Sequence, residues 1–131
     1  MPTDPIHSPA RIKQVNSFRI LDFGGGKRPT DIDGFLDFAD KVFVFIDTKV
    51  EGVEMPGGQR LALGRLCDAA RDPLCRRSLV LIGSHNTPLD EEIDTGACPV
   101  VELRHKGEWR GPKFDLTVRE AVDLSLIGKK L

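Results

Sequence analysis

Apolar and polar positions alternate in two runs, over residues 32–38 and 42–49, that are separated by a short polar segment. Such runs of β-forming residues around a turn predict a β-hairpin. Both of its faces would be apolar, which predicts burial on both sides, as in the middle of an α/β structure. One face would carry Ile32, Leu36, Phe38, Val42, Val44 and Ile46, and the other Phe35, Phe43 and Phe45.

The register of this hairpin determines where its charges lie. If Asp40 is the centre of a three-residue turn, residues equally far from it pair, so that Asp33 opposes Asp47. Period-two alternation then places Asp33, Asp47 and Lys49 on one face. A slip of one residue would move every side chain to the opposite face. The other expected pairs are Phe38–Val42, Leu36–Val44 and Phe35–Phe45.

Two facing carboxylates repel each other, and they are costly at the end of a buried strand unless a cation compensates them. A hard divalent metal such as Mg²⁺, held by one or two carboxylates and several waters, is one candidate. The ammonium group of Lys49 is another. A metal and an amine can act together in phosphodiester hydrolysis. The alternative is a solvated hairpin whose charges simply face water.

The segment after the hairpin predicts a β-α-β unit. Apolar residues at helical spacing predict a helix over residues 59–70, which Pro73 stops, and the apolar run 78–84 predicts a buried strand. A strand, a helix and a second strand would form a right-handed parallel crossover. The apolar helix positions are Leu61, Ala62, Leu63, Leu66, Ala69 and Ala70.

Shorter signals complete the predicted secondary structure. Residues 18–23, 100–105 and 108–110 are typical of short strands. Thr117 and Glu120 form a capping box that would open a last helix reaching Ile127. Residues 1–17 contain three prolines and are expected to form a flexible arm with a short turn of helix near residues 11–15. Residues 18–131 would then form one α/β domain, a mixed sheet flanked by helices.

Composition narrows the functional classes. A chain of 131 residues with 40% hydrophobic residues can build one core. The net charge of −1 argues against a protein that coats nucleic acid through bulk electrostatics, although it leaves room for a local basic track. Clusters of lysine and arginine could form this track, and the alternative is that they are ordinary solvent-exposed surface. They comprise Lys27 and Arg28, Arg60 and Arg65, Arg76 and Arg77, and Arg104, Lys106, Arg110 and Lys113.

The cysteines and the hydropathy pattern bear on location. Cys67, Cys75 and Cys98 have no C-x-x-C spacing, so neither a disulfide framework nor a zinc ribbon is predicted. No apolar run reaches the roughly 18 residues of a membrane span. We therefore expect a cytoplasmic protein without a membrane partner. Two single residues are expected to be structural, His85 as a strand cap and Trp109 in packing, rather than contacts to phosphate or to an unpaired base.

An acidic residue at the start of one hairpin strand, followed by a strand ending in Asp47-Thr48-Lys49, resembles the PD-(D/E)XK nuclease superfamily. The segment Pro29-Thr30-Asp31-Ile32-Asp33-Gly34 is similar to the region of its first acidic residue, and fourteen residues separate Asp33 from Asp47. Gln59 resembles the glutamine that opens the next helix in many members. The likeness runs from Arg19 to about His105 and is to small phage-type and Holliday-junction-resolvase-like nucleases.

The resemblance implies a restriction-endonuclease-like core and a nuclease that hydrolyses DNA. It implies that Asp33 and Asp47 bind Mg²⁺ or Mn²⁺ together with the backbone carbonyl of Thr48. Lys49 would position or activate the attacking water, and Gln59 would orient the substrate or the metal's waters. Asp31 competes with Asp33 as the first ligand. By analogy, two chains could form a homodimer.

Two departures from the superfamily pattern leave an alternative open. Residues 1–30 contain no glutamate, although the superfamily often carries one on a helix before the hairpin, and Asp22 is a candidate substitute. Aspartate also replaces the commoner glutamate of the second motif at Asp47. The alternative function is therefore a catalytically inactive module of the same fold that binds nucleic acid or a protein partner.

Overall fold

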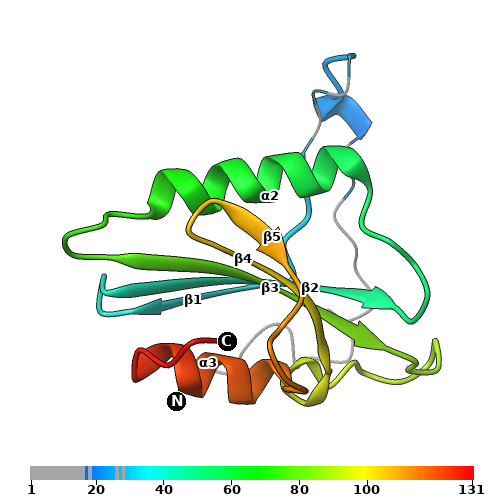
Figure 1. Ribbon diagram of the computed structural model, residues 1–131. Helices are drawn as coiled ribbons and strands as arrows, with labels where there is room; N and C mark the ends of the chain where they lie inside the picture. Colours follow the sequence, from blue (N-terminus) through cyan, green and yellow to red (C-terminus); the bar gives the residue numbers. More distant parts are fainter. Residues whose placement is uncertain (1–16, 18, 26, 28) are drawn as a thin grey trace, which may run out of the picture.

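The computed structural model describes residues 17, 19–25, 27 and 29–131. Its centre is a five-stranded mixed sheet with the strand order β1-β2-β3-β4-β5. The α-helices α2 and α3 lie on opposite faces of this sheet (Figure 1). The predicted fold class, a mixed sheet flanked by helices, is therefore confirmed at the level of an α/β fold. No helix in the described part of the chain is long and apolar enough to cross a membrane.

The hairpin has the predicted register. β1 (Gly34–Phe38) pairs antiparallel with β2 (Val42–Val50), with Phe38 opposite Val42 and Gly34 opposite Ile46. Ala39 and Asp40 in the turn both have positive φ, and the amide of Lys41 donates to the carbonyl of Phe38 at 3.0 Å. The next pair in this register would be Asp33 and Asp47, so the two acids lie at the end of the ladder.

The two hairpin strands differ in burial, which corrects one expectation. β2 is buried on both faces, as predicted, because β1 and β3 flank it and both helices cover it. β1 is an edge strand, and Phe35 is 50% exposed and Leu36 38% exposed. The prediction of a hairpin buried on both sides is therefore wrong for β1, because β1 is the last strand of the sheet among the described residues.

The predicted β-α-β unit is present. α2 (Gly57–Ala70) joins β2 to β3 (Arg77–His85), which is parallel to β2 and has Ile82 opposite Asp47. The helix begins two residues earlier than the hydrophobic pattern predicts, because Gly57 and Gly58 carry no side chain that could reveal helical periodicity. α2 packs on one face of the sheet through Leu63 and Cys67, which contact Phe45, Val80 and Ile82.

The remaining elements follow the predictions closely. β4 (Val100–His105) pairs antiparallel with β3, and β5 (Glu108–Arg110) pairs back on β4. Between β3 and β4 lies the 3₁₀ helix η3 (Thr95–Ala97). α3 (Val118–Leu126) begins with the predicted capping box of Thr117 and Glu120. It covers the second face of the sheet, where Val122 and Ala121 join the larger core cluster.

The segment before the hairpin contradicts one prediction. Where a strand was expected at residues 18–23, the structure has the 3₁₀ helix η2 (Arg19–Leu21), and Phe18 lies outside the described residues. Its backbone is satisfied locally, since the Phe23 amide donates to the Lys27 carbonyl. Phe23 is 76% exposed, so its burial does not favour a sheet pairing. The short helix and most of the arm predicted for residues 1–17 lie outside the described residues.

Candidate active site

The end of β2 carries a buried carboxylate. The side chain of Asp47 points to the α2 face, in phase with Phe43 and Phe45, and the residue is only 1% exposed. Its Oδ2 atom lies 2.9 Å from Nζ of Lys49 and accepts a hydrogen bond from Nε2 of Gln59 at 3.2 Å. A buried carboxylate is costly without such partners. The structure thus brings together three of the four predicted catalytic residues around one oxygen atom.

Asp33 lies one residue before β1, and its side chain continues the hydrogen bonding between the two hairpin strands. Its Oδ2 accepts hydrogen bonds from the backbone amide of Thr48 at 2.7 Å and from the Thr48 hydroxyl at 2.9 Å. The carboxylate thereby takes the place that a further backbone carbonyl of β1 would occupy in the ladder. This arrangement holds Asp33 at the edge of the sheet beside Asp47, as the register predicts.

Gln59 connects the segment before β1 with β2. Its side-chain nitrogen donates to the backbone carbonyl of Asp31 at 3.0 Å and to Asp47. The residue sits in the first turn of α2, directly after the glycines that follow Pro56. One amide group therefore ties together the loop that carries Asp33 and the strand that carries Asp47. Its observed contacts are therefore with the backbone two residues before Asp33 and with the carboxylate of Asp47.

The electrostatics of the site are those of two close acids and one amine. Burial raises the pKa of Asp47 above its ordinary value, the Lys49 ammonium lowers it, and the neighbouring Asp33 carboxylate raises it. The net direction is upward. The repulsion expected between the facing acids is therefore present, and Lys49 compensates only part of it.

The donor set can be compared with what a hard divalent cation needs. Oδ2 of each acid accepts a hydrogen bond from the protein, and the two carboxyl groups lie close enough to interact with each other. The Thr48 carbonyl points to the same edge as its amide, because both groups of one strand residue face the same side. Two carboxylates and a carbonyl suit Mg²⁺, which keeps several waters. Across the described ranges, no group of three or more His, Cys, Asp or Glu side chains could hold a metal.

The two further acids considered from the sequence do not join this site. Asp31 contributes its backbone carbonyl to Gln59, while its side chain is exposed and forms no described hydrogen bond. The carboxylate of Asp22 accepts from the amide of Gly24 at 2.9 Å, within its own turn. That turn follows η2, which lies on the far side of α2 from the sheet (Figure 1). Asp33 is therefore the acid that accompanies Asp47.

Sequence reasoning missed several residues next to Lys49. Lys49 lines a cavity of about 660 Å³ together with Glu54, Arg60 and Glu102. Glu102 lies opposite Ile82, which in turn lies opposite Asp47, so the two acids share one row across three strands. Arg60 forms a bidentate ion pair with Glu102. The closeness of Glu102 to the candidate site follows only from the strand order, because 55 residues separate Asp47 from Glu102 in the chain.

His85 and Trp109 both make the structural contacts expected of them. The Nδ1 atom of His85 accepts a hydrogen bond from the amide of Thr87 at the end of β3, which caps the strand. Trp109 packs against the α2 core cluster, and the guanidinium carbon of Arg60 lies 4.5 Å from its ring centroid. Cation–π contacts of this kind fix an aromatic ring in place.

Comparisons with known proteins found no match among protein-family models, curated proteins or solved structures. The case for a function therefore depends on the residues of the site itself.

Proposed function

We propose that this protein is a metal-dependent nuclease that hydrolyses phosphodiester bonds of DNA with Mg²⁺ or Mn²⁺. The observation that carries the proposal is the convergence of Asp33, Asp47, Lys49 and Gln59 at one end of the hairpin. Two acids, an amine and an amide in contact with each other supply the groups that such hydrolysis requires.

Each side chain has a role in this proposal. Asp33 and Asp47 would hold the metal, with the Thr48 carbonyl beside them. The ion, when bound, supplies Lewis acidity toward the phosphoryl group and lowers the pKa of a bound water. Lys49, 2.9 Å from Asp47, orients the attacking water and balances charge that develops on the phosphate. Gln59 would hold the segment before Asp33 close to Asp47.

The order of elements supports the finer fold proposal, a restriction-endonuclease-like core. An antiparallel hairpin carries the acids and the lysine, a crossover helix begins with Gln59, and a parallel strand follows. Lys49 also lines the cavity at the end of β2, through which a substrate phosphate would reach the amine. A fold alone does not define an activity, so the site residues carry the functional proposal.

The test is cleavage of labelled DNA. The purified chain is incubated with Mg²⁺ or Mn²⁺ and with duplex, branched and single-stranded DNA, and with RNA for comparison. We expect metal-dependent cleavage of at least one DNA substrate. Lys49→Ala should lower its rate by about 10²-fold or more, the range that general acid–base groups contribute.

Lys41→Ala is the matched control. Lys41 is an exposed lysine in the turn of the same hairpin, at the end away from Asp47, and its replacement should leave the rate unchanged. Circular dichroism of both variants checks that they fold. Absence of cleavage of every substrate with either metal, or equal loss in both variants, would contradict the proposal.

A second candidate is a module of the same fold that binds nucleic acid or a protein without cleaving it. The absence of a third acid near Asp47 within the described residues favours this candidate. Titration with Mn²⁺, followed by calorimetry, separates the two. A nuclease should bind the ion through Asp33 and Asp47, and Asp33→Asn should weaken that binding. A chain that binds DNA but no divalent ion would be an inactive module.

A further inference from the structure

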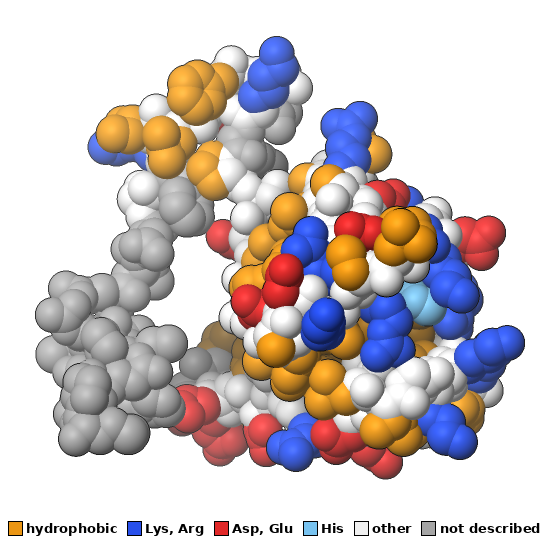
Figure 2. Space-filling view, turned by 90° about the vertical axis from the view of Figure 1, so that its left-hand side faces the viewer, with side chains coloured by type: hydrophobic (Ala, Val, Ile, Leu, Met, Phe, Trp, Pro, Cys, Tyr) orange, Lys and Arg blue, Asp and Glu red, His pale blue; other side chains and the backbone are white. Residues whose placement is uncertain are grey.

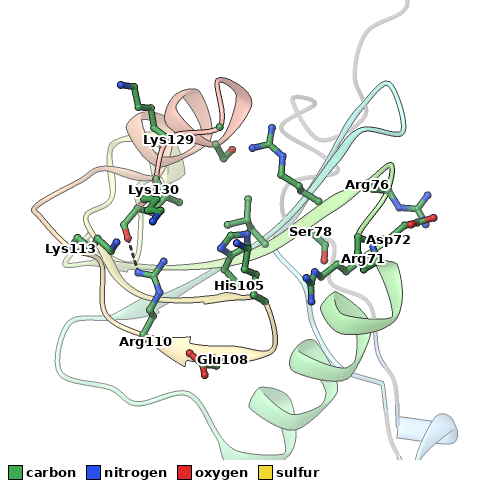
Figure 3. A pocket seen from close by; sticks show the side chains of 17 residues that line it. Arg71, Asp72, Arg76, Ser78, His105, Glu108, Arg110, Lys113, Lys129 and Lys130 are labelled. Atoms are coloured by element: carbon green, nitrogen blue, oxygen red, sulfur yellow. Dashed lines mark hydrogen bonds between the residues drawn. The ribbon is translucent and has the colours of Figure 1, made fainter.

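A second charged region lies at the opposite end of the sheet. A cavity of about 510 Å³ is bounded by the end of α2, the start of β3, the β4–β5 turn and the end of α3 (Figure 3). Its β3 residue Ser78 lies four residues from Ile82, the neighbour of Asp47. That separation is roughly 13 Å along the strand. The cavity is therefore distinct from the candidate active site.

Lysine and arginine dominate the lining of this cavity, which we call the basic pocket. Eight of them line it, against two acids, Asp72 and Glu108. Figure 2 shows blue side chains gathered on the corresponding face. Six of the eight form neither an ion pair nor a side-chain hydrogen bond among the described residues. These are Arg71, Arg77, Lys106, Lys113, Lys129 and Lys130.

The other two cations have structural partners. Arg76 donates to the Ala70 carbonyl at the end of α2 and pairs with Asp40. Arg110 donates to the Leu131 carbonyl at 2.6 Å, which holds the segment after α3 against β5 (Figure 3). These two contacts fasten the walls of the basic pocket. The six unpaired cations project from elements that are thus held in place.

The pKa of His105 reflects its burial and the positive charge around it in the basic pocket. Its half-buried imidazole lies in the middle of the pocket, surrounded by the basic side chains (Figure 3). Burial lowers the pKa of His105, and Lys106, Arg110 and Arg71 lower it further. A concave surface with uncompensated charge of one sign concentrates the field and attracts ions of the opposite sign.

The lining indicates which anion fits. Its apolar side chains are Pro73, Leu79 and Leu131, and no Phe, Tyr or Trp lines it. The half-buried imidazole of His105 is its one aromatic ring, so the large stacking surfaces typical of base-binding sites are absent from the lining. Six unpaired cations exceed what a single phosphate can engage. The volume lies within the range of pockets for compact ligands. These features favour a ligand with several phosphates whose other parts are not recognised.

We propose that the basic pocket binds two or more neighbouring phosphate groups of one ligand, supplied either by a free polyphosphate or by the backbone of a nucleic-acid strand. Arginine and lysine from separate segments of the chain can contact successive phosphates, and the arginines can do so with two parallel hydrogen bonds. Binding at this pocket does not depend on the proposed nuclease activity, because the two sites share no residue.

The test measures binding of tripolyphosphate by calorimetry in a buffer with EDTA. Arg77→Gln combined with Lys113→Gln should weaken binding by at least about tenfold, because two charged hydrogen-bond donors are lost. Both residues are exposed, so the variant should fold. The matched control is Arg65→Gln with Arg119→Gln, which removes the same charge outside the basic pocket and should leave the affinity within about twofold.

A competing oligothymidylate strand then identifies the source of the phosphates. Displacement of tripolyphosphate by the strand, together with weaker strand binding in the Arg77→Gln and Lys113→Gln variant, assigns the pocket to a nucleic-acid backbone. Saturable tripolyphosphate binding that the strand does not displace assigns it to a free polyphosphate. The proposal is overturned if tripolyphosphate shows no saturable binding, or if the pocket and control variants weaken it equally.

Discussion

The two ends of the sheet treat charge in opposite ways. At the end of β2, Asp47 is buried and each charged group touches a partner, so that Lys49 and Gln59 compensate a single carboxylate. At the start of β3, six cations share a pocket without forming ion pairs among the described residues. A charge that contacts partners has a field of short range, whereas charges of one sign without partners act on ions that approach from solution.

The difference follows from burial. A charge with almost no access to water must be paired within the protein, because its desolvation is not recovered otherwise. Exposed cations such as Lys113 and Lys129 keep their hydration and tolerate one another. We therefore expect substitutions at the buried end to affect folding, and substitutions at the basic pocket to affect mainly binding.

The largest contrast should come from reversing a charge at each end. Asp47→Lys would bury a second ammonium beside Lys49 and remove its partner, which should destabilise the fold by about 3–5 kcal/mol. Lys113→Glu should change the free energy of unfolding by less than about 0.5 kcal/mol, as for most surface positions. Urea unfolding followed by circular dichroism measures both. Similar losses at the two ends would remove the basis of the comparison.

A smaller effect is expected at the edge of the compensated end. Asp33→Ala removes the acceptor for the amide and the hydroxyl of Thr48, and should lower the free energy of unfolding by about 1 kcal/mol. Asp31→Ala is the control, because its side chain forms no described hydrogen bond. Urea midpoints of the two variants give the difference. If Asp31→Ala is the more damaging change, Asp33 does not extend the hairpin.

The smallest effect concerns pH at the basic pocket. The pKa of His105 is lowered in the folded state from an ordinary value of 6.5, so the unfolded chain takes up the proton first as pH falls. Folding stability should therefore decrease as pH falls through about 6.5 and below. His105→Gln should make the decrease between about pH 7.5 and 5.5 shallower. Urea unfolding at both pH values tests this, and an unchanged or steeper decrease would contradict it.

Much of the hairpin could be predicted because its information is local. Period-two alternation and a short turn determine which residues pair, and the observed register is the predicted one. The segment around Arg19–Leu21 shows the limit of such reasoning. An apolar run predicts a strand, but a strand needs a neighbour, and the sequence of the run itself does not say whether one is available.

The candidate site divides in the same way. Asp33, Asp47 and Lys49 could be placed together from the sequence, because one hairpin carries all three. The ion pair of Arg60 and Glu102 could not, since it depends on β3 lying between β2 and β4. The hydrogen bond from Gln59 to the Asp31 carbonyl could not be predicted from the sequence either, because it depends on how α2 packs on the sheet.

By itself, the sequence determined the hairpin register, the crossover helix and the capping box of α3, because each depends on residues only a few positions apart. Only the tertiary structure decided that Arg77, Lys113 and Lys129 share one pocket. Arg77 begins β3, Lys113 lies between β5 and α3, and Lys129 follows α3, and these segments meet because the strand order and the placement of α3 bring them to one end of the sheet. Contacts between residues distant in the chain are a property of the whole packing.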